Sequence, residues 1–248
     1  MANVSKILDR SYIIMKTCVV IPTYNEAHQI ATLVEQLKNQ GLEVVVVDDG
    51  SFDDTPSIAL YNGATVLKNG CNLGKGVALN RGFTYALHHN FDAVITMDGD
   101  GQHDPADVPC FMRLAQHSSS GVLIGNRMHK AKDMPWPRLL ANKHMSWFIS
   151  LVARQDIPDS QCGFRLIKKE VLEKLELCSR NFEIETELIL LASRLGYRIE
   201  AVPITTVYNG HKSRIRPLLD TMRFVRFMIN YGLRKGKKNN GRGAAAGA

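Results

Sequence analysis

The chain of 248 residues has few cysteines and no long hydrophobic run. Its five cysteines are odd in number, scattered and without CxxC spacing, which argues against a disulfide framework and against a structural zinc. No window reaches about 18 uninterrupted apolar residues, and the N-terminus lacks the apolar core of a signal peptide. These absences predict a chain that is neither secreted nor membrane-spanning and that works in a reducing, cytoplasmic compartment.

Acidic residues are nearly absent from the C-terminal segment. After residue 210 the sequence has ten Lys and Arg residues and a single acid, Asp220. This segment therefore accounts for the positive net charge of the whole chain, which is +7. A basic segment of this kind is attracted to the phosphates of lipids or of nucleic acid. Nucleic acid is not the expected partner, because the segment does not interleave aromatic and basic residues on a dedicated binding fold.

The same segment is predicted to form an amphipathic basic helix over 213–235, before a low-complexity tail over 236–248. One face of that helix is an apolar stripe: Leu218, Met222, Val225 and Ile229. Such a helix suits an anionic membrane interface and is too short and too charged to cross a bilayer. We therefore expect a peripheral protein on the cytoplasmic face of a membrane, with a membrane-anchoring subunit as a further partner. The alternative is a helix that packs on the domain and has a solvated outer face.

Short runs rich in β-branched residues alternate with segments of helical spacing. The predicted strands are 18–23, 44–49, 64–68, 93–98 and 121–127. The predicted helices are 27–40, 54–63, 76–90, 137–153 and 182–196. The alternation predicts an α/β fold with a mostly parallel central sheet flanked by helices, similar to a Rossmann fold.

Polar loops follow the first four predicted strands. They read PTYNE, DDGSFDDT, NGCNLGKG and DGDGQHD. In parallel sheets, ligands bind beyond the carboxyl ends of the strands, where these four loops would meet. The sequence therefore predicts one binding site at this edge rather than four unrelated turns.

Asp98 and Asp100 end the fourth strand and are separated by one glycine. Their carboxylates repel each other unless a cation lies between them, and Mg²⁺ or Mn²⁺ typically takes one or two carboxylates plus phosphate oxygens of the substrate. The position after a buried strand favours a metal site over a solvated acidic turn. Gln102 offers another oxygen ligand, whereas His103 and Asp104 are interpreted as turn or cap residues.

Two further loop residues suit a nucleotide. The carboxylate of Asp49 can accept hydrogen bonds from a nucleobase or a ribose, although its neighbours could simply cap the next helix. Lys75 supplies a positive charge for phosphates within a loop whose glycines let the backbone approach a ligand. That loop does not match GxxxxGK[ST], so a P-loop is rejected.

Eight motifs then occur in a fixed order: IPTYNE, VVVVDDGSFDDT, NLGKG, MDGDGQHDP, GNR, DSQCGFRLI, FEIETELIL and VPITTVY. In this order the chain resembles the family 2 glycosyltransferases with the GT-A fold, and within them the dolichol-phosphate mannose and dolichyl-phosphate glucose synthases. The resemblance implies one GT-A catalytic domain over 17–212, after an N-terminal segment 1–16. Its nucleotide-sugar half would be about 17–104, and its acceptor half about 105–212.

The resemblance also assigns roles to individual residues. It implies that the nucleotide sugar is held by Pro22, Tyr24, Glu26, Asp49, Lys75 and Asp98. It implies that a divalent metal, Mg²⁺ or Mn²⁺, is held by Asp98, Asp100 and Gln102. It implies that the acceptor phosphate is bound by Arg127, Arg138, Asn142, Lys212 and Ser213. Arg127 or Arg138 could instead be a surface ion-pair residue.

The acceptor decides whether the reaction needs a base. A lipid-linked phosphate has a second pKa of about 6 and is already a nucleophile near neutrality. A sugar hydroxyl would need a carboxylate to take its proton, and Asp159 is then the candidate catalytic base. Asp159 could equally orient its loop or Arg165. Glu185 and Glu187 of the last predicted helix either touch the donor sugar or lie on a solvated face.

We therefore expect a metal-dependent, inverting glycosyltransferase that moves a hexose from a GDP- or UDP-linked donor to a polyprenyl phosphate. Transfer to a hydroxyl of a glycan or glycolipid is the first alternative. A nucleotidyltransferase, which would release pyrophosphate, is the second. The third is a catalytically silent, membrane-associated binding subunit, against which the intact acidic motif argues.

Overall fold

The computed structural model describes residues 15–128, 134, 136–205, 226–228 and 231. Their strands are β1 (Thr17–Thr23), β2 (Glu43–Asp48), β3 (Thr65–Lys68), β4 (Ala93–Thr96), β5 (Val122–Asn126), β6 (Arg165–Lys168) and β7 (Ile199–Pro203). Their helices are α1 (Ala27–Asn39), α2 (Thr55–Tyr61), α3 (Lys75–His88), η1 (Pro105–Asp107), α4 (Val108–His117), α5 (Trp136–Ala153), α6 (Lys169–Leu172) and α7 (Glu183–Arg194).

The strands form one seven-stranded sheet in the order β3-β2-β1-β4-β6-β5-β7. All pairings are parallel except those of β6, which runs antiparallel to both β4 and β5. The predicted mostly parallel α/β sheet is confirmed, and the predicted strands and helices correspond to elements whose ends agree within a few residues. Strands β6 and β7 and helices α4 and α6 are not among the predicted ranges.

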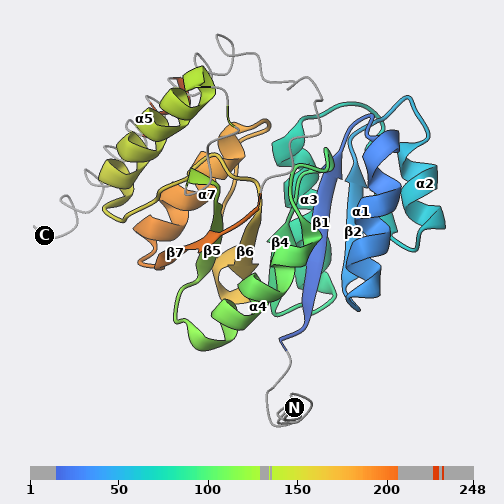
Figure 1. The fold of residues 1–248 in the computed structure, drawn as a ribbon, viewed down its shortest axis with the longest axis horizontal. Helices are drawn as coiled ribbons and strands as arrows, with labels where there is room; N and C mark the ends of the chain where they lie inside the picture. Colours follow the sequence, from blue (N-terminus) through green and yellow to red (C-terminus); the bar gives the residue numbers. More distant parts are fainter. Residues whose placement is uncertain (1–14, 129–133, 135, 206–225, 229–230, 232–248) are drawn as a thin grey trace, which may run out of the picture.

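Helices cover the sheet on both faces, with α1 and α4 on one face and α3 on the other (Figure 1). Burial on both faces explains why β2 reads as the unbroken apolar run Val44–Val47, in which every side chain is buried. Helix α5 packs on α7, on the far side of the molecule from α2 (Figure 1). The core therefore runs the whole width of the sheet.

The register of the sheet brings the polar loops together. Thr23 at the end of β1 lies beside Asp48 at the end of β2, so the loops that follow start at the same level. The amide of Asp49 donates to the Thr23 carbonyl at 2.8 Å, and the amide of Asn69 donates to the Asp48 carbonyl at 2.8 Å. The loops after β1, β2 and β3 are thus joined directly beyond the strand ends.

Little of the predicted basic helix belongs to the described part of the chain. Phe227, Met228 and Tyr231 pack against the hydrophobic core, and the Tyr231 hydroxyl donates to the Leu190 carbonyl of α7 at 3.4 Å. These three side chains follow the alternative of a helix packed on the domain. Apart from Arg226, the rest of the predicted helix, together with Lys212 and Ser213, lies outside the described residues. Among the described helices, none is both long and apolar enough to cross a membrane.

Candidate active site

The loops after β1 and β2 hold each other through side chains. The Asn25 amide donates to Ser51 Oγ at 2.8 Å, and the Phe52 amide donates back to Asn25 Oδ1 at 2.8 Å. Asn25 adopts a left-handed conformation, with φ of 54°, which asparagine tolerates. Tyr24 meets Phe52 edge to face, with ring centroids 6.3 Å apart, and Phe52 is almost fully exposed. Two aromatic rings in contact therefore lie in the loops predicted to bind the nucleoside.

Asp49 is buried, and its carboxylate binds the glycine-rich loop. Asp49 Oδ1 accepts from Asn69 Nδ2 at 2.7 Å and from the Leu73 amide at 3.0 Å. Asp49 Oδ2 accepts from the Gly74 amide at 2.7 Å. In this structure the side chain predicted to contact the nucleoside fixes the loop that carries Lys75.

Lys75 begins α3 between two glycines that the backbone requires. Gly74 has φ of 103°, and the Gly76 amide donates to the Arg180 carbonyl at 2.7 Å. A Cβ at Gly76 would collide with the Ser179 carbonyl. The segment before α7 therefore lies directly against the start of α3, which is possible only without side chains at these positions.

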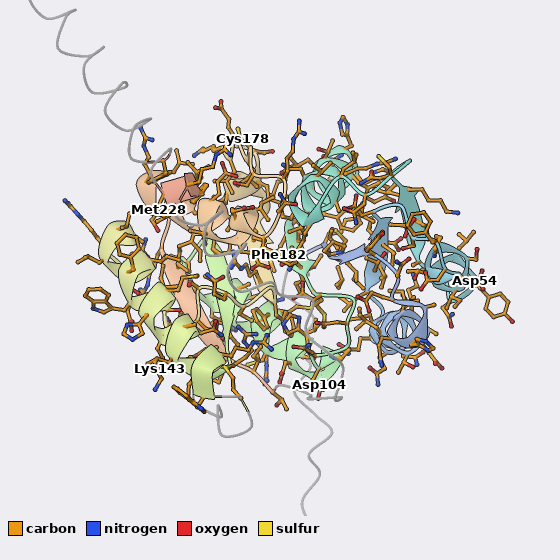
Figure 2. All side chains as sticks on the ribbon, turned by 90° about the horizontal axis from the view of Figure 1, so that it is seen from above. Asp54, Asp104, Lys143, Cys178, Phe182 and Met228 are labelled. Carbon is orange, nitrogen blue, oxygen red and sulfur yellow. The ribbon has the colours of Figure 1, made fainter. Side chains whose placement is uncertain are left out.

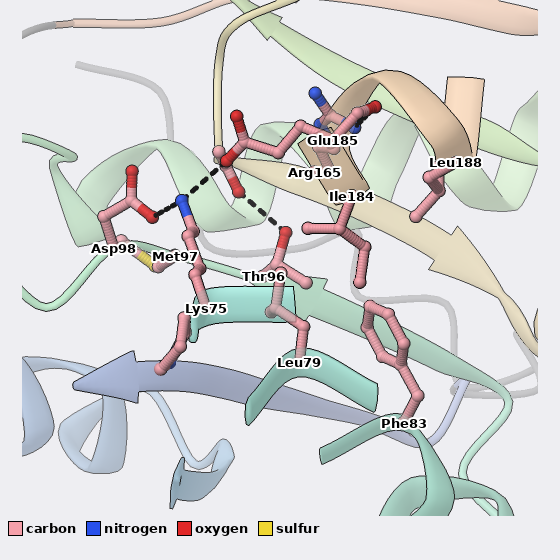
Figure 3. Close-up of a pocket in the computed structure, with 12 residues that line it drawn as sticks. Lys75, Leu79, Phe83, Thr96, Met97, Asp98, Arg165, Ile184, Glu185 and Leu188 are labelled. Carbon is pink, nitrogen blue, oxygen red and sulfur yellow. Dashed lines mark hydrogen bonds and ion pairs between the residues drawn. The ribbon is translucent and has the colours of Figure 1, made fainter. Parts of the chain in front are cut away.

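The Lys75 ammonium joins two carboxylates from distant parts of the chain. Lys75 Nζ lies 2.5 Å from Asp98 Oδ1 and 2.6 Å from Glu185 Oε1 (Figure 3). Burial acts to lower the pKa of Lys75, but the charges of Asp98 and Glu185 outweigh burial and raise it. Burial likewise acts to raise the pKa of Asp98, and the Lys75 charge reverses that effect and holds it well below its usual range.

The acidic turn after β4 brings Asp98 and Asp100 close together. Burial and the neighbouring charge of Asp98 raise the pKa of Asp100, although the Gln102 amide donates to Asp100 Oδ1 at 3.0 Å. His103 is buried, its Nδ1 accepts from the Asp98 amide at 3.3 Å, and burial lowers its pKa to about 4. His103 is thus a neutral turn residue, in line with its structural interpretation.

The chemistry of these donors fits a divalent cation that is shared with a substrate. Burial and the charge of Asp98 both raise the pKa of Asp100, and a cation would relieve the repulsion between the two carboxylates. Within the described residues, no group of three or more His, Cys, Asp and Glu side chains forms a complete metal cage. An ion at Asp98 and Asp100 would therefore need oxygens from another source, as Mg²⁺ does when it binds substrate phosphates.

The DSQCGFR segment leads into β6 and closes over the acidic turn. Thr96 Oγ1 donates to the Gly163 carbonyl at 2.7 Å, and a Cβ at Gly163 would lie 2.6 Å from Asp98 Oδ2. The buried Arg165 guanidinium donates to three backbone carbonyls, those of Ser160, Cys162 and Glu185. Arg165 thus ties this segment to α7, and it is Arg127 that pairs with Asp159.

Arg127 and Asp159 form a buried bidentate ion pair. Arg127 Nε and Nη2 lie 2.7 Å and 2.8 Å from the two carboxylate oxygens, and the Arg127 amide donates to Oδ2 at 3.2 Å. Asp159 is 0% exposed and Arg127 is 6% exposed. Arg127, predicted to bind the acceptor phosphate, and Asp159, the candidate base, therefore pair with each other in this structure.

Helix α5 carries the remaining described acceptor candidates. The charge of Arg138 acts against the rise in the pKa of Asp100. Asn142 lies one turn further along, half-buried, with its amide 3.8 Å from Met134 Sδ. Figure 2 shows Lys143 of α5 and Asp54 beside α2 on opposite sides of the molecule, with Asp104 between them.

A small pocket lies under Lys75, polar on one side and apolar on the other (Figure 3). Its lining includes Pro22, Asp98, Glu185, Leu79, Phe83 and Leu188. Sequence reasoning placed Glu185 and Glu187 at the sugar or on a solvated face, but both are buried. Glu187 accepts from the amides of Cys178 and Ser179 at 3.0 Å and 2.7 Å. The sequence signal for these two residues was the alternation of three acids with other residues at the start of an aliphatic helical run.

An acidic turn, a buried lysine and a glycine-rich loop at the carboxyl edge of a parallel sheet define an α/β enzyme with a site for an anionic ligand. The chain belongs to the glycosyl transferase family 2, whose model matches residues 18–176. It is a glycosyltransferase that depends on a nucleotide sugar.

Two curated relatives carry lipid phosphates in their names. The chain is 29% identical over 215 residues to the UDP-N-acetylglucosamine–dolichyl-phosphate N-acetylglucosaminyltransferase of Methanococcus voltae, covering 77% of this chain and 86% of the relative. It is 30% identical over 207 residues to the undecaprenyl-phosphate mannosyltransferase of Micrococcus luteus, covering 78% and 84%.

The fold is also similar to a solved structure, that of glucosyl-3-phosphoglycerate synthase from Mycobacterium tuberculosis in complex with Mn²⁺, UDP and glucosyl-3-phosphoglycerate. The TM-score is 0.62 at 22% identity, covering 86% of this chain and 76% of the other. The GT-A-like fold is thereby confirmed.

Proposed function

We propose that this enzyme transfers a hexose, with inversion, from a nucleotide diphosphate sugar to a polyprenyl phosphate at a membrane surface. The observation that carries the proposal is the acidic turn, where the Lys75 ammonium binds Asp98 and the charge of Arg138 acts to lower the pKa of Asp100. Two cations at a pair of carboxylates suit two phosphate groups, one from the donor and one from the acceptor. The relatives that act on dolichyl and undecaprenyl phosphates support the choice of acceptor.

On the donor side, we assign Asp98, Asp100 and Gln102 to a Mg²⁺ or Mn²⁺ ion that also binds the donor diphosphate. When bound, that ion supplies Lewis-acid stabilisation of the departing nucleoside diphosphate. Lys75 would neutralise further charge on the same diphosphate. Pro22, Tyr24, Glu26 and Asp49 would form the nucleoside end, with Asp49 acting through the loop that it fixes.

On the acceptor side, the pairing of Asp159 with Arg127 supports an acceptor that needs no base. A fully buried carboxylate whose two oxygens both accept hydrogen bonds from a guanidinium has no open path to a substrate hydroxyl. A phosphate dianion needs no proton removed. We therefore assign Arg138 and Asn142 to the acceptor phosphate and Arg127 to holding the surrounding loops.

A membrane surface is proposed to deliver this acceptor. One face of α5 is apolar and open to solvent, with Trp136 74%, Leu140 48%, Trp147 67% and Leu151 63% exposed. The helix contains no acidic residue, and its basic residues suit anionic head groups. Tryptophan beside basic side chains is typical of membrane interfaces, so α5 joins the predicted C-terminal helix as the proposed contact.

The test is a transfer assay with the purified chain. Mn²⁺ or Mg²⁺, a short polyprenyl phosphate and each common nucleotide sugar are incubated in turn, and glycolipid is measured by mass spectrometry. One donor should give a lipid-phosphate hexose that is absent with Asp100→Asn. Product from a hydroxyl acceptor that disappears with Asp159→Asn, and no product with polyprenyl phosphate, would contradict the proposal.

A further inference from the structure

The side chains of Lys75 and Glu185 form an ion pair, and a different contact fixes the backbone beside Lys75. The Lys75 side chain is 14% exposed and that of Glu185 is 8% exposed. The backbone beside Lys75 is fixed by the bond from the Gly76 amide to the Arg180 carbonyl. The ammonium can therefore change partners by rotation of the lysine side chain alone, while the Lys75 backbone stays in place.

The ammonium of Lys75 lies at the Asp98 oxygen that a metal ion would need. Lys75 Nζ is 2.5 Å from Asp98 Oδ1, so the two groups are in direct, charge-assisted contact. A divalent cation bound to the same oxygen would lie a few ångströms from the ammonium and would be repelled by it. Lysine and metal thus compete for Asp98.

Glu185 gives the displaced ammonium a second anchor. Glu185 Oε1 is 2.6 Å from Lys75 Nζ, and the backbone carbonyl of Glu185 is held by Arg165. Without Glu185, an ammonium that left Asp98 would be a buried charge with no partner, which is strongly destabilising. With Glu185, the ammonium keeps one carboxylate throughout and can reach toward a diphosphate.

We propose that Glu185 is a positioning residue that retains the Lys75 ammonium when a divalent cation displaces it from Asp98. Lys75 is then an internal competitor of the metal until the nucleotide diphosphate arrives and offers the ammonium a new partner. Metal and nucleotide diphosphate consequently bind with positive coupling. The inference rests on the metal site of the proposed function and is independent of the acceptor.

The experiment measures Mn²⁺ binding without nucleotide, from the electron paramagnetic resonance signal of free Mn²⁺. The wild type is compared with Glu185→Gln, which should bind Mn²⁺ more weakly because its ammonium has no other carboxylate to hold it away from Asp98. Glu185→Gln is then compared with the double variant Lys75→Met, Glu185→Gln, so that these two proteins differ only in the ammonium. The double variant should bind Mn²⁺ about tenfold more tightly, because a unit positive charge beside the site has been removed. Equal or weaker binding by the double variant would overturn the inference.

Two controls separate this effect from a structural defect. Both replacements are nearly isosteric, and thermal unfolding checks that each variant folds; a misfolded site cannot gain affinity for Mn²⁺. In an Asp98→Asn background, Lys75→Met should change Mn²⁺ affinity by less than about threefold, because the negative charge for which the two cations compete is gone. A tenfold gain in that background would contradict competition at Asp98.

The second readout is coupling, with UDP and GDP as the probes. The diphosphate should tighten Mn²⁺ binding more in the wild type than in the double variant, since only the wild type has an ammonium to transfer. The same enhancement in both proteins would contradict the inference. If Mn²⁺ binding follows this pattern and no donor gives glycolipid, the proposed acceptor fails while the inference stands.

Discussion

At the residue scale, the conformation of the acidic turn requires two glycines, because a Cβ atom at either position would collide with a neighbouring side chain. Gly163 lies so close to Asp98 that any side chain would occupy the space of the carboxylate. Gly99 lies equally close to Thr23, where a Cβ would be 2.8 Å from the Thr23 methyl group. The aspartates are therefore oriented by the backbone of neighbouring loops.

Replacement of Gly163 by alanine tests this close approach. In Gly163→Ala the new methyl group would displace the Asp98 carboxylate, because its Cβ would lie 2.6 Å from Oδ2. We expect at least about tenfold weaker binding of Mn²⁺ with nucleotide diphosphate and a loss of about 1–3 kcal/mol in the free energy of unfolding. Titration calorimetry and urea unfolding measure the two effects. Gly70→Ala is the control, since nothing lies within 4 Å of its Cβ; wild-type binding by Gly163→Ala would refute the argument.

Sequence position indicates some of these residues and conceals others. Asp98 and Asp100 could be predicted because two acids follow a buried strand, where solvated turns are less expected. The partnership of Lys75 with Glu185 could not, because the two residues are 110 positions apart and only the folded chain brings them together. The same holds for Arg127 and Asp159, which are 32 positions apart.

At the element scale, the spacing of apolar residues and the residues that begin and end helices predicted most helices and strands but not the antiparallel β6. Its four residues, Arg165–Lys168, are two apolar positions flanked by basic ones, a pattern too short to separate from a loop. Arg165 is fully inside the protein because three backbone carbonyls solvate its guanidinium. The pattern of apolar and polar residues cannot predict that an arginine is buried when its only partners are backbone carbonyls.

Helix α5 gives a prediction about membranes. Replacing Trp136 and Trp147 together by serine should weaken binding to anionic vesicles at least about tenfold, because the two most exposed apolar side chains of this face are lost. Vesicle flotation with anionic and with neutral lipid measures the binding. Tyr61→Ser on α2 is the matched control, since Tyr61 is 92% exposed on the opposite side of the molecule. Unchanged flotation of the tryptophan variant would exclude α5 as the contact.

At the scale of the whole molecule, buried histidine makes stability depend on pH. Burial lowers the pKa of His103 to about 4, below its ordinary value of 6.5. Between these values the unfolded chain binds the proton that the folded chain refuses, so the free energy of unfolding falls as the pH drops from about 6.5 to about 4. The shift corresponds to about 3 kcal/mol at about 1.36 kcal/mol per pKa unit.

The measurement compares urea unfolding of the wild type and His103→Asn across this pH range, with a chelator present. Asparagine keeps an acceptor for the Asp98 amide but does not titrate. The variant should therefore lose clearly less stability on acidification than the wild type. Parallel curves for the two proteins would show that His103 does not cause the pH dependence.

The place of β6 between β4 and β5 has a consequence for synthesis of the chain. Strand β4 is complete at Thr96, yet the strand that covers its outer edge ends at Lys168. On the ribosome, the first half must therefore wait with an unpaired apolar edge while about seventy further residues are made. The segments before and after residue 104 share one sheet, and a nascent chain that stalls between β4 and β6 would expose that edge to other chains.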